Sequence, residues 1–248
     1  MTGKPSHRGP DPRDSEAFDA ACLPALRAAA ADYSWLLSRD YATVSALKLV
    51  GDRYRLTERQ RVAVRRSACS DQDCAKRLER RSDETSLGGC ELVVDGFNVL
   101  LTVEVALGGA VVLSCRDGTY RDIAGLHGTY RRVDETMPAI SLLGGVISGL
   151  GVRQCRWLFD RPVSNSGRIR SLFLKYAEEN GLDWVVELVD DPDPLLKASS
   201  RIIATADSAV LDGCSRWFNL ARCVVEADRK STRLNSSHLA RSRMPSSA

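Results

Sequence analysis

Leu92-Val93-Val94-Asp95-Gly96-Phe97-Asn98-Val99-Leu100 decides the fold, because it is a short apolar run that ends in an aspartate, a glycine and an asparagine. Two later runs, 156–160 and 202–207, repeat the design and end at Asp160 and Asp207. Apolar runs of this length, bounded by turn residues, predict strands that are buried on both faces of a parallel sheet. Ligands bind at the carboxyl ends of such strands. We therefore expect three carboxylates to meet at one edge of the sheet.

A divalent cation would relieve the repulsion between these carboxylates, so Asp95, Asp160 and Asp207 are predicted ligands of Mg²⁺ or Mn²⁺. Such a metal activates water and neutralises charge on a phosphate, which is the chemistry of phosphodiester cleavage. Asn98, one turn after Asp95, is placed to orient a carboxylate or a metal-bound water. An aspartate that ends a single strand commonly just caps a helix, but three strands with the same ending favour a site.

Two further acidic residues, Glu135 and Asp212, are candidates for a fourth metal ligand or a general base. For Asp212 the alternative is an ion pair with Arg216, four residues later.

Apolar periodicity and turn residues around these runs predict an α/β architecture preceded by a small all-helical domain. Thr57 and Gln60 have the spacing of a capping box at the start of one helix. The expected helices lie at 16–38 (broken near Pro24), 43–50, from 57, at 139–150, 169–180 and 208–214. The expected additional strands lie at 111–114, 184–189 and 217–225.

The domain organisation follows from these elements. Residues 1–14 are polar and proline-rich and are expected to be disordered. A helical domain over 15–81, a linker over 82–89 ending in Gly88-Gly89, and an α/β domain over 90–227 follow.

For the last segment, 228–248, the sequence predicts an unusual origin. Asp228 to His238 and Ser242 to Ala248 match, in one reading frame, the two constant parts of a common sequencing adapter, with a barcode-sized gap between them. The alternative is a natural Ser/Arg-rich tail. The two-part match favours a translated adapter, so we expect no contribution of this segment to the native fold.

Composition bounds the class of protein. The chain has 248 residues, of which 44% are apolar and 27% charged, and no apolar run approaches membrane-spanning length. Without a signal-peptide core, these features predict a cytoplasmic protein that does not enter a membrane. Eight cysteines without a framework spacing predict reduced thiols rather than disulfides, and the lone pair Cys69 and Cys74 is weak evidence for zinc.

Two basic segments are candidates for contact with a nucleic acid. The run 53–66 holds six arginines, among them Arg53, Arg59 and Arg66, against one glutamate, with Tyr54 interleaved. Arginine forks and aromatic faces suit phosphates and bases. A solvated helix face explains the same pattern equally well.

The second segment follows Asp160. Ser164 and Ser166 precede a predicted helix, with Arg161 and Arg168 beside them, so hydroxyls and free amides could bind a phosphate. A simple helix cap with surface arginines is the alternative.

Asp95-Gly96-Phe97-Asn98-Val99 resembles the D-G-x-N opening of NYN-type ribonucleases, and Thr205-Ala206-Asp207-Ser208 resembles the T-x-D-S motif of PIN-like nucleases. The resemblance implies a PIN-like three-layer sandwich with a parallel sheet and a metal-dependent nuclease site that includes Asp95, Asn98 and Asp207. This chain departs from the pattern, because the middle acid falls on Glu104 or Glu135 and the second acid of the last motif is delayed to Asp212.

The whole chain, including 45–54 and 160–168, is also similar to an uncharacterised prokaryotic family that pairs two domains of unknown function, numbered 434 and 5616. We therefore expect a Mg²⁺- or Mn²⁺-dependent endoribonuclease whose helical domain binds RNA, another nucleic acid or a partner. The alternative is a non-catalytic RNA- or protein-binding regulator with the same fold. The sequence leaves the oligomeric state open, with a homodimer among the states it allows.

Overall fold

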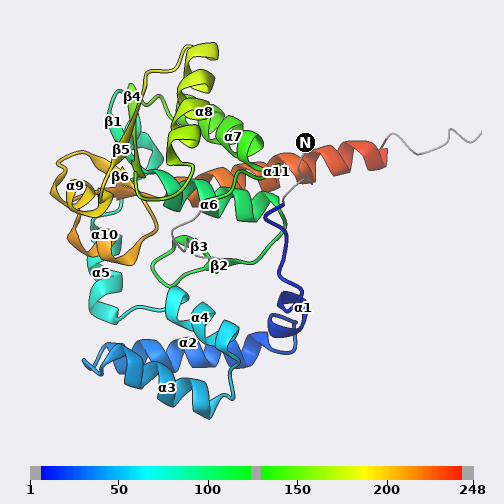
Figure 1. Ribbon diagram of the computed structural model, residues 1–248. Helices are drawn as coiled ribbons and strands as arrows, with labels where there is room; N and C mark the ends of the chain where they lie inside the picture. Colours follow the sequence, from blue (N-terminus) through cyan, green and yellow to red (C-terminus); the bar gives the residue numbers. More distant parts are fainter. Residues whose placement is uncertain (1–6, 124–129, 242–248) are drawn as a thin grey trace, which may run out of the picture.

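The computed structural model describes residues 7–123 and 130–241, with side chains described as far as Lys230. Figure 1 shows a helical region below an α/β region, and a short β-hairpin lies between the two. No helix in these ranges is long and apolar enough to span a bilayer. All eight cysteines lie within the described residues and are free thiols, as predicted.

The helical region packs around one small core. Its helices are α1 (Asp14–Ala17), α2 (Leu23–Leu37), α3 (Thr43–Arg53), α4 (Glu58–Ser67) and α5 (Asp71–Glu79). Tyr33 of α2 and Val50 of α3 are buried in this core together with Val64 of α4. The capping box is confirmed: the Thr57 hydroxyl accepts from the Gln60 amide, and the Gln60 side chain accepts from the Thr57 amide.

The α/β region follows the short 3-10 helix η1 (Glu84–Leu87). Its elements are, in chain order, β1 (Glu91–Asp95), α6 (Gly96–Leu107), β2 (Val112–Ser114), β3 (Tyr120–Asp122), α7 (Thr136–Gly149), β4 (Gln154–Asp160), α8 (Ser166–Glu179), β5 (Trp184–Val189), α9 (Pro192–Ala198), β6 (Ile202–Ala204), α10 (Ser208–Gly213), β7 (Trp217–Phe218) and α11 (Leu220–Arg241).

Within the described residues, five parallel strands form the main sheet in the order β5-β4-β1-β6-β7. The chain therefore runs from β1 outward through β4 to β5, returns past β1 to β6, and continues outward to β7. The order reverses between β1 and β6. In open α/β sheets, the crevice at the carboxyl ends of the two strands beside such a reversal is the usual ligand site.

Alternate residues of β1 face opposite layers of helices, which explains why its sequence is apolar throughout. Leu92 and Val94 pack in the core formed with α6, α7, α8 and α11. Val93 packs in the second core, which α9 and α10 cover. The predicted α/β architecture with a parallel sheet and a preceding helical region is confirmed.

Gly96 is required where β1 passes into α6. A Cβ at this position would lie 2.6 Å from the Phe159 ring and 2.8 Å from the Leu158 carbonyl oxygen. Both residues belong to β4, so only glycine allows α6 to begin this close to the neighbouring strand. The close start of α6 holds Asp95 and Asn98 at the edge of the sheet.

The strand predicted over 217–225 is wrong beyond its first two residues. Strand β7 ends at Phe218, and α11 begins at Leu220. Leu220, Ala221, Val224 and Val225 are all buried, with a spacing that fits one face of a helix. Helix packing against α6 and α7 explains the apolar run, which a strand of the same composition would resemble in sequence.

Helix α11 continues through the segment expected to be a translated adapter, as far as Arg241 (Figure 1). Val225 is the last buried residue of the helix among those whose side chains are described. The packing that fixes α11 therefore precedes residue 228.

Two segments that were expected to be a disordered end and a linker make specific contacts with the rest of the protein. Residues 7–14 were expected to be disordered, but Arg8 pairs with the buried Glu104 and Asp14 pairs with Arg59. Residues 1–6 lie outside the described part. In the stretch 82–89, expected as a linker, Leu87 is completely buried in the main core.

Candidate functional site

Asp95 stands at the end of β1, beside the reversal of strand order, and is 7% exposed. Its Oδ2 accepts a hydrogen bond of 2.7 Å from the Thr205 hydroxyl. The Thr205 Oγ1 in turn accepts from the Asp207 amide at 3.0 Å. One buried threonine therefore connects the end of β1 to the turn after β6.

Asn98 and Arg121 fix the same turn from two sides. The Asn98 Oδ1 accepts from the Ala206 amide at 2.8 Å, and the Arg121 Nε donates to the Ala206 carbonyl oxygen at 2.6 Å. The Asn98 Nδ2 donates to no group in the described part of the chain. Asn98 thus orients the turn that carries Asp207.

The electrostatic setting of Asp95 is unfavourable for a charged carboxylate. Burial is the main cause that raises the pKa of Asp95 to about 7; the hydrogen bond from Thr205 opposes this rise, and the charges of Asp207, Asp160 and Asp193 add to it. Among the described residues no Lys or Arg forms an ion pair with Asp95. Burial also raises the pKa of Asp160, together with the charges of Asp193 and Asp191.

The three predicted strand-end aspartates gather at this edge, but at different levels. Asp95 is level with Leu158 of β4, so Asp160 lies two residues further along, and Asp207 lies three residues beyond the end of β6. The Asp207 Oδ1 caps α10 by accepting from the amides of Ala209 and Val210. Over the described side chains, no three His, Cys, Asp or Glu residues stand close enough to hold a metal ion.

The other predicted acidic residues are bound elsewhere. Asp212 accepts two hydrogen bonds from Arg77, at 2.7 and 2.9 Å, rather than pairing with Arg216. Glu135 accepts from His7 and from the Arg8 amide. Glu104 is completely buried, and nine residues of helix, roughly 13 Å, separate it from Asp95. None of the three faces the edge at Asp95.

The predicted anion-binding turn before α8 is only partly open. The buried Ser166 hydroxyl donates to the Arg161 carbonyl oxygen, and the Arg161 side chain donates to the Leu188 carbonyl oxygen. Ser164 and Arg168 are exposed. The turn itself is fixed by Asn165, which has left-handed backbone geometry and no capping side-chain hydrogen bond.

The arginines of 53–66 point in different directions. Arg53 is exposed on α3, near Asp32 and over the Tyr54 ring. Arg59 pairs with Asp14, which neutralises its charge. Arg66 has a looser contact, 3.8 Å, with Asp122 and lines a cavity that Asn98 and Asp207 also line. The structure therefore brings only Arg66 of the three toward the sheet edge.

A buried ion network ties the helical region to the site. The Asp117 Oδ2 accepts from Arg77 of α5 at 2.7 Å and from Arg121 at 2.6 Å. Its Oδ1 accepts from the Thr119 amide and hydroxyl. Despite burial, the pKa of Asp117 stays below its usual value because Arg121, Thr119 and Arg77 stabilise the anion. Through Arg121, this network reaches the Ala206 carbonyl.

Sequence reasoning missed three residues of the edge: Thr205, Asp193 and Arg121. Thr205 lies in the quoted Thr205–Ser208 motif, so its position was available from the sequence. Asp193 lies in the first turn of α9, in an acidic stretch with two prolines whose sequence suggests only a turn. Arg121 is one arginine in a short hairpin, and only the fold brings it to Ala206.

Comparison with known proteins places this chain among families of unknown function. A family described as a domain of unknown function (DUF5616) matches residues 84–223, and a family described as a protein of unknown function (DUF434) matches residues 25–80. An uncharacterised protein of Methanocaldococcus jannaschii is 27% identical over 180 residues, which cover 73% of this chain and 86% of the relative. No solved structure matches significantly.

Proposed function

This chain belongs to the DUF5616 family, with the DUF434 segment before it as predicted, and we propose that it is a divalent-metal-dependent ribonuclease with a PIN-like fold. The observation that carries the proposal is Asp95: a buried carboxylate at the strand-order reversal, with Asp160, Asp193 and Asp207 close enough to raise its pKa. Uncompensated carboxylates in such a crevice suit a cation that arrives with an anionic substrate.

The donor set fits Mg²⁺ or Mn²⁺, which prefer oxygen ligands. Mg²⁺ keeps several waters and is usually held by one or two carboxylates plus substrate phosphates, so a closed cage of three protein ligands is not needed. Asp95 and one oxygen of Asp207 would hold the ion, with Asp160 and Asp193 further out. A bound metal supplies activation of water and stabilisation of charge on the phosphate.

The residues of the chain itself do the positioning. Thr205 holds Asp95 and the Asp207 amide in one orientation. Asn98 and Arg121 hold the Ala206 peptide, which fixes the direction in which Asp207 leaves β6. The D-G-x-N and T-x-D-S resemblances involve the same residues and support phosphodiester cleavage in RNA.

A non-catalytic RNA- or protein-binding regulator is the second candidate. The observation that favours it is that both motif aspartates already accept hydrogen bonds from groups of the protein. Asp95 accepts from the Thr205 hydroxyl, and Asp207 accepts from an amide at the start of α10. In this case the carboxylates only shape the edge, and no metal-dependent step occurs.

Cleavage of RNA separates the two candidates. Purified protein incubated with labelled single-stranded RNA should cut it in Mn²⁺ or Mg²⁺ and lose the activity in EDTA, because the carboxylate edge alone does not activate water. Asp207→Asn should lower the rate at least about a hundredfold. Asp183→Asn, which alters an exposed carboxylate at the amino end of β5, is the control and should retain the wild-type rate. Cleavage that survives both EDTA and Asp207→Asn would instead indicate a contaminant and favour the regulator.

A further inference from the structure

A cavity of about 750 Å³ joins the helical region to the proposed catalytic edge. One wall carries Tyr41, Arg65 and Arg66 of the helical region, and the other carries Asn98, Asp207 and Ser208. A cavity of similar size between α2, α4 and β2 is mostly apolar, and no proposed site residue lines it. Only the first cavity therefore connects to the chemistry.

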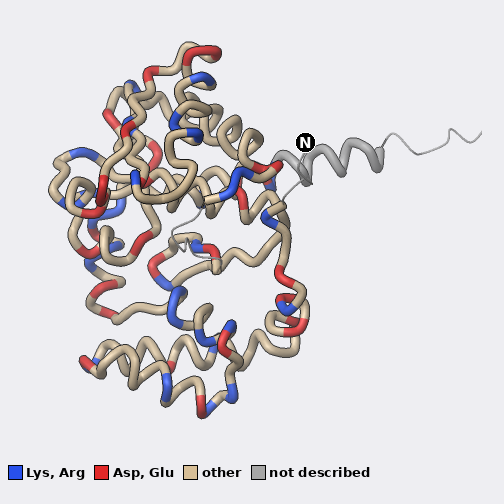
Figure 2. The backbone as a smooth tube through the Cα atoms, viewed as in Figure 1, with Lys and Arg blue, Asp and Glu red and all other residues tan. Residues whose placement is uncertain are grey.

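The free positive charge in this cavity comes from Arg65 of α4, because Arg66 of the same helix lies 3.8 Å from the Asp122 carboxylate. Arg77 and Arg121 also line it, but both are committed to Asp117. Arg65 is exposed and forms no ion pair with any described acidic side chain. Figure 2 shows α4 marked by basic segments.

Two acidic residues, Asp40 and Asp73, line the cavity as well. Asp73 accepts a hydrogen bond from the Ser70 hydroxyl at the start of α5, while Asp40 is exposed in the loop after α2. Neither forms an ion pair with Arg65, so that guanidinium remains available to an anion from solution.

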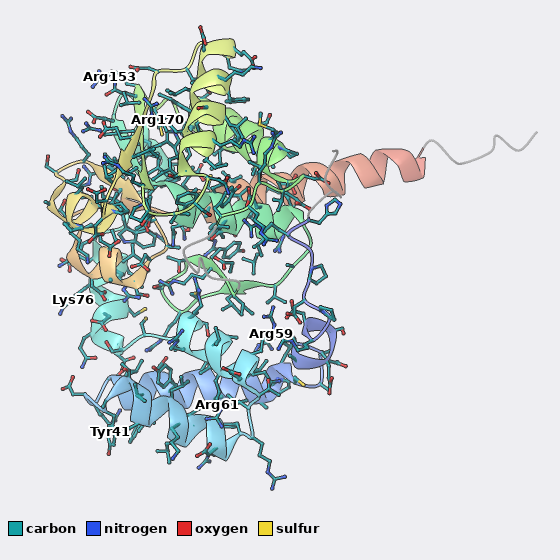
Figure 3. All side chains as sticks on the ribbon, in the orientation of Figure 1. Tyr41, Arg59, Arg61, Lys76, Arg153 and Arg170 are labelled. Carbon is teal, nitrogen blue, oxygen red and sulfur yellow. The ribbon has the colours of Figure 1, made fainter. Side chains whose placement is uncertain are left out.

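Tyr41 supplies an aromatic surface on the same wall. It lies in the loop between α2 and α3 and is 53% exposed, at the end of the helix pair in Figure 3. No described aromatic ring stacks on it. An exposed ring beside a free guanidinium is the combination with which proteins bind single-stranded nucleic acid, because bases stack on the ring and phosphates pair with the charge.

We propose that this cavity binds the single-stranded RNA segment next to the scissile phosphate, with a phosphate on Arg65 and a base on Tyr41. The inference rests on the proposed function, since Asn98 and Asp207 form the far wall. The volume is that of a small-ligand site, which admits one or two nucleotides and excludes a double helix. The helical region is then half of the substrate site rather than a separate binding module.

Equilibrium binding in EDTA tests the cavity without cleavage. The full chain is titrated into a short fluorescein-labelled single-stranded RNA, followed by anisotropy over a range of salt concentrations. Arg65→Gln should weaken binding several-fold and lower the salt slope by about one unit, as for one lost phosphate contact. Tyr41→Ala should weaken binding about tenfold, as for one lost stacking contact. Arg65→Lys should recover part of the affinity.

Arg153→Gln is the matched control. Arg153 is exposed, just before β4 at the amino end of the sheet, and lies at the opposite end of the molecule from Tyr41 in Figure 3. It should keep wild-type affinity and salt slope. Because Arg65, Tyr41 and Arg153 are all exposed, unchanged melting temperatures are expected and confirm that each variant folds.

The possible outcomes separate this inference from the proposed function. Weaker binding in Arg65→Gln and Tyr41→Ala, in a protein that never cleaves RNA, supports the cavity and refutes the nuclease. If the protein cleaves RNA with metal, but Arg65→Gln and Tyr41→Ala bind RNA as tightly as Arg153→Gln, the proposed binding cavity is refuted and the nuclease proposal stands. Duplex RNA that competes as well as single-stranded RNA, or a wild type that binds neither, also overturns the inference.

Discussion

Asp95→Asn should make the metal-free protein more stable than wild type at about pH 8, by up to about 4 kcal/mol. In the folded protein, burial and the neighbouring carboxylates raise the pKa of Asp95 to about 7, from 3.8 for an ordinary Asp. Above pH 7 the wild type must hold a buried charge, which asparagine does not carry. The Thr205 hydroxyl can still donate to the asparagine oxygen, so the hydrogen bond is retained.

The dependence on pH gives this prediction its sign. A carboxyl group with a raised pKa in the folded state binds its proton more tightly when folded, so its burial costs nothing below about pH 4. The free energy of unfolding of the wild type should therefore fall as the pH rises from about 4 to about 7, and that fall should be smaller in Asp95→Asn. Urea unfolding at several pH values measures both proteins. If the free energy of unfolding depends on pH equally in wild type and Asp95→Asn, the claim that Asp95 carries a buried charge above pH 7 is contradicted. Asp183→Asn, at an exposed site, should follow the wild type.

Asp117→Asn should destabilise the protein by about 3–5 kcal/mol. Asp117 is completely buried and accepts hydrogen bonds from Arg77 and Arg121, which are 3% and 5% exposed. Removal of its charge leaves Arg121 without an acidic partner in the described residues, while Arg77 keeps Asp212. The same change should loosen the Ala206 turn, because Arg121 loses the partner that orients it.

Asp71→Asn is the matched comparison for the buried network. Asp71 pairs with Arg116 on the surface, where 66% of its side chain is exposed. Loss of an exposed ion pair should cost less than about 1 kcal/mol. Urea unfolding of the two variants compares the sites directly, and similar losses would mean that Asp117 contributes no more than a surface pair.

The sequence predicts most of the fold because local patterns decide it. Strands β1, β4 and β5 follow from apolar runs, of which β1 is the most completely buried, and the start of α4 follows from the Thr57–Gln60 capping box. The start of α11 does not, because the apolar run 217–225 suits a strand and a buried helix face equally well. Only the packing of Leu220 and Val224 against α6 and α7 decides between them.

The site is predictable in part for a similar reason. Strand ends place Asp95, Asp160 and Asp207 at one edge, since parallel strands share a direction. Arg121 and Asp193 arrive there through a hairpin and a crossover helix, for which the sequence carries no positional signal. The pairing of Asp212 with Arg77, and of Arg59 with Asp14, depends on contacts between segments more than 40 residues apart. Sequence spacing instead suggested Arg216 as one partner for Asp212, and either a phosphate or solvent for Arg59.

The melting temperature with and without Mn²⁺, measured at about pH 8 for wild type and Asp95→Asn, tests most directly whether the edge at Asp95 is a metal site. If it is, Mn²⁺ should stabilise the wild type, by about 2.7 kcal/mol at a concentration of about 100 times Kd, because the ion binds only the folded carboxylates. Asp95→Asn should show little or no shift, and the wild-type shift should shrink near pH 6 as Asp95 takes up its proton. A wild type that does not respond to Mn²⁺, or an equal shift in both proteins, would contradict a metal-dependent nuclease site at this edge.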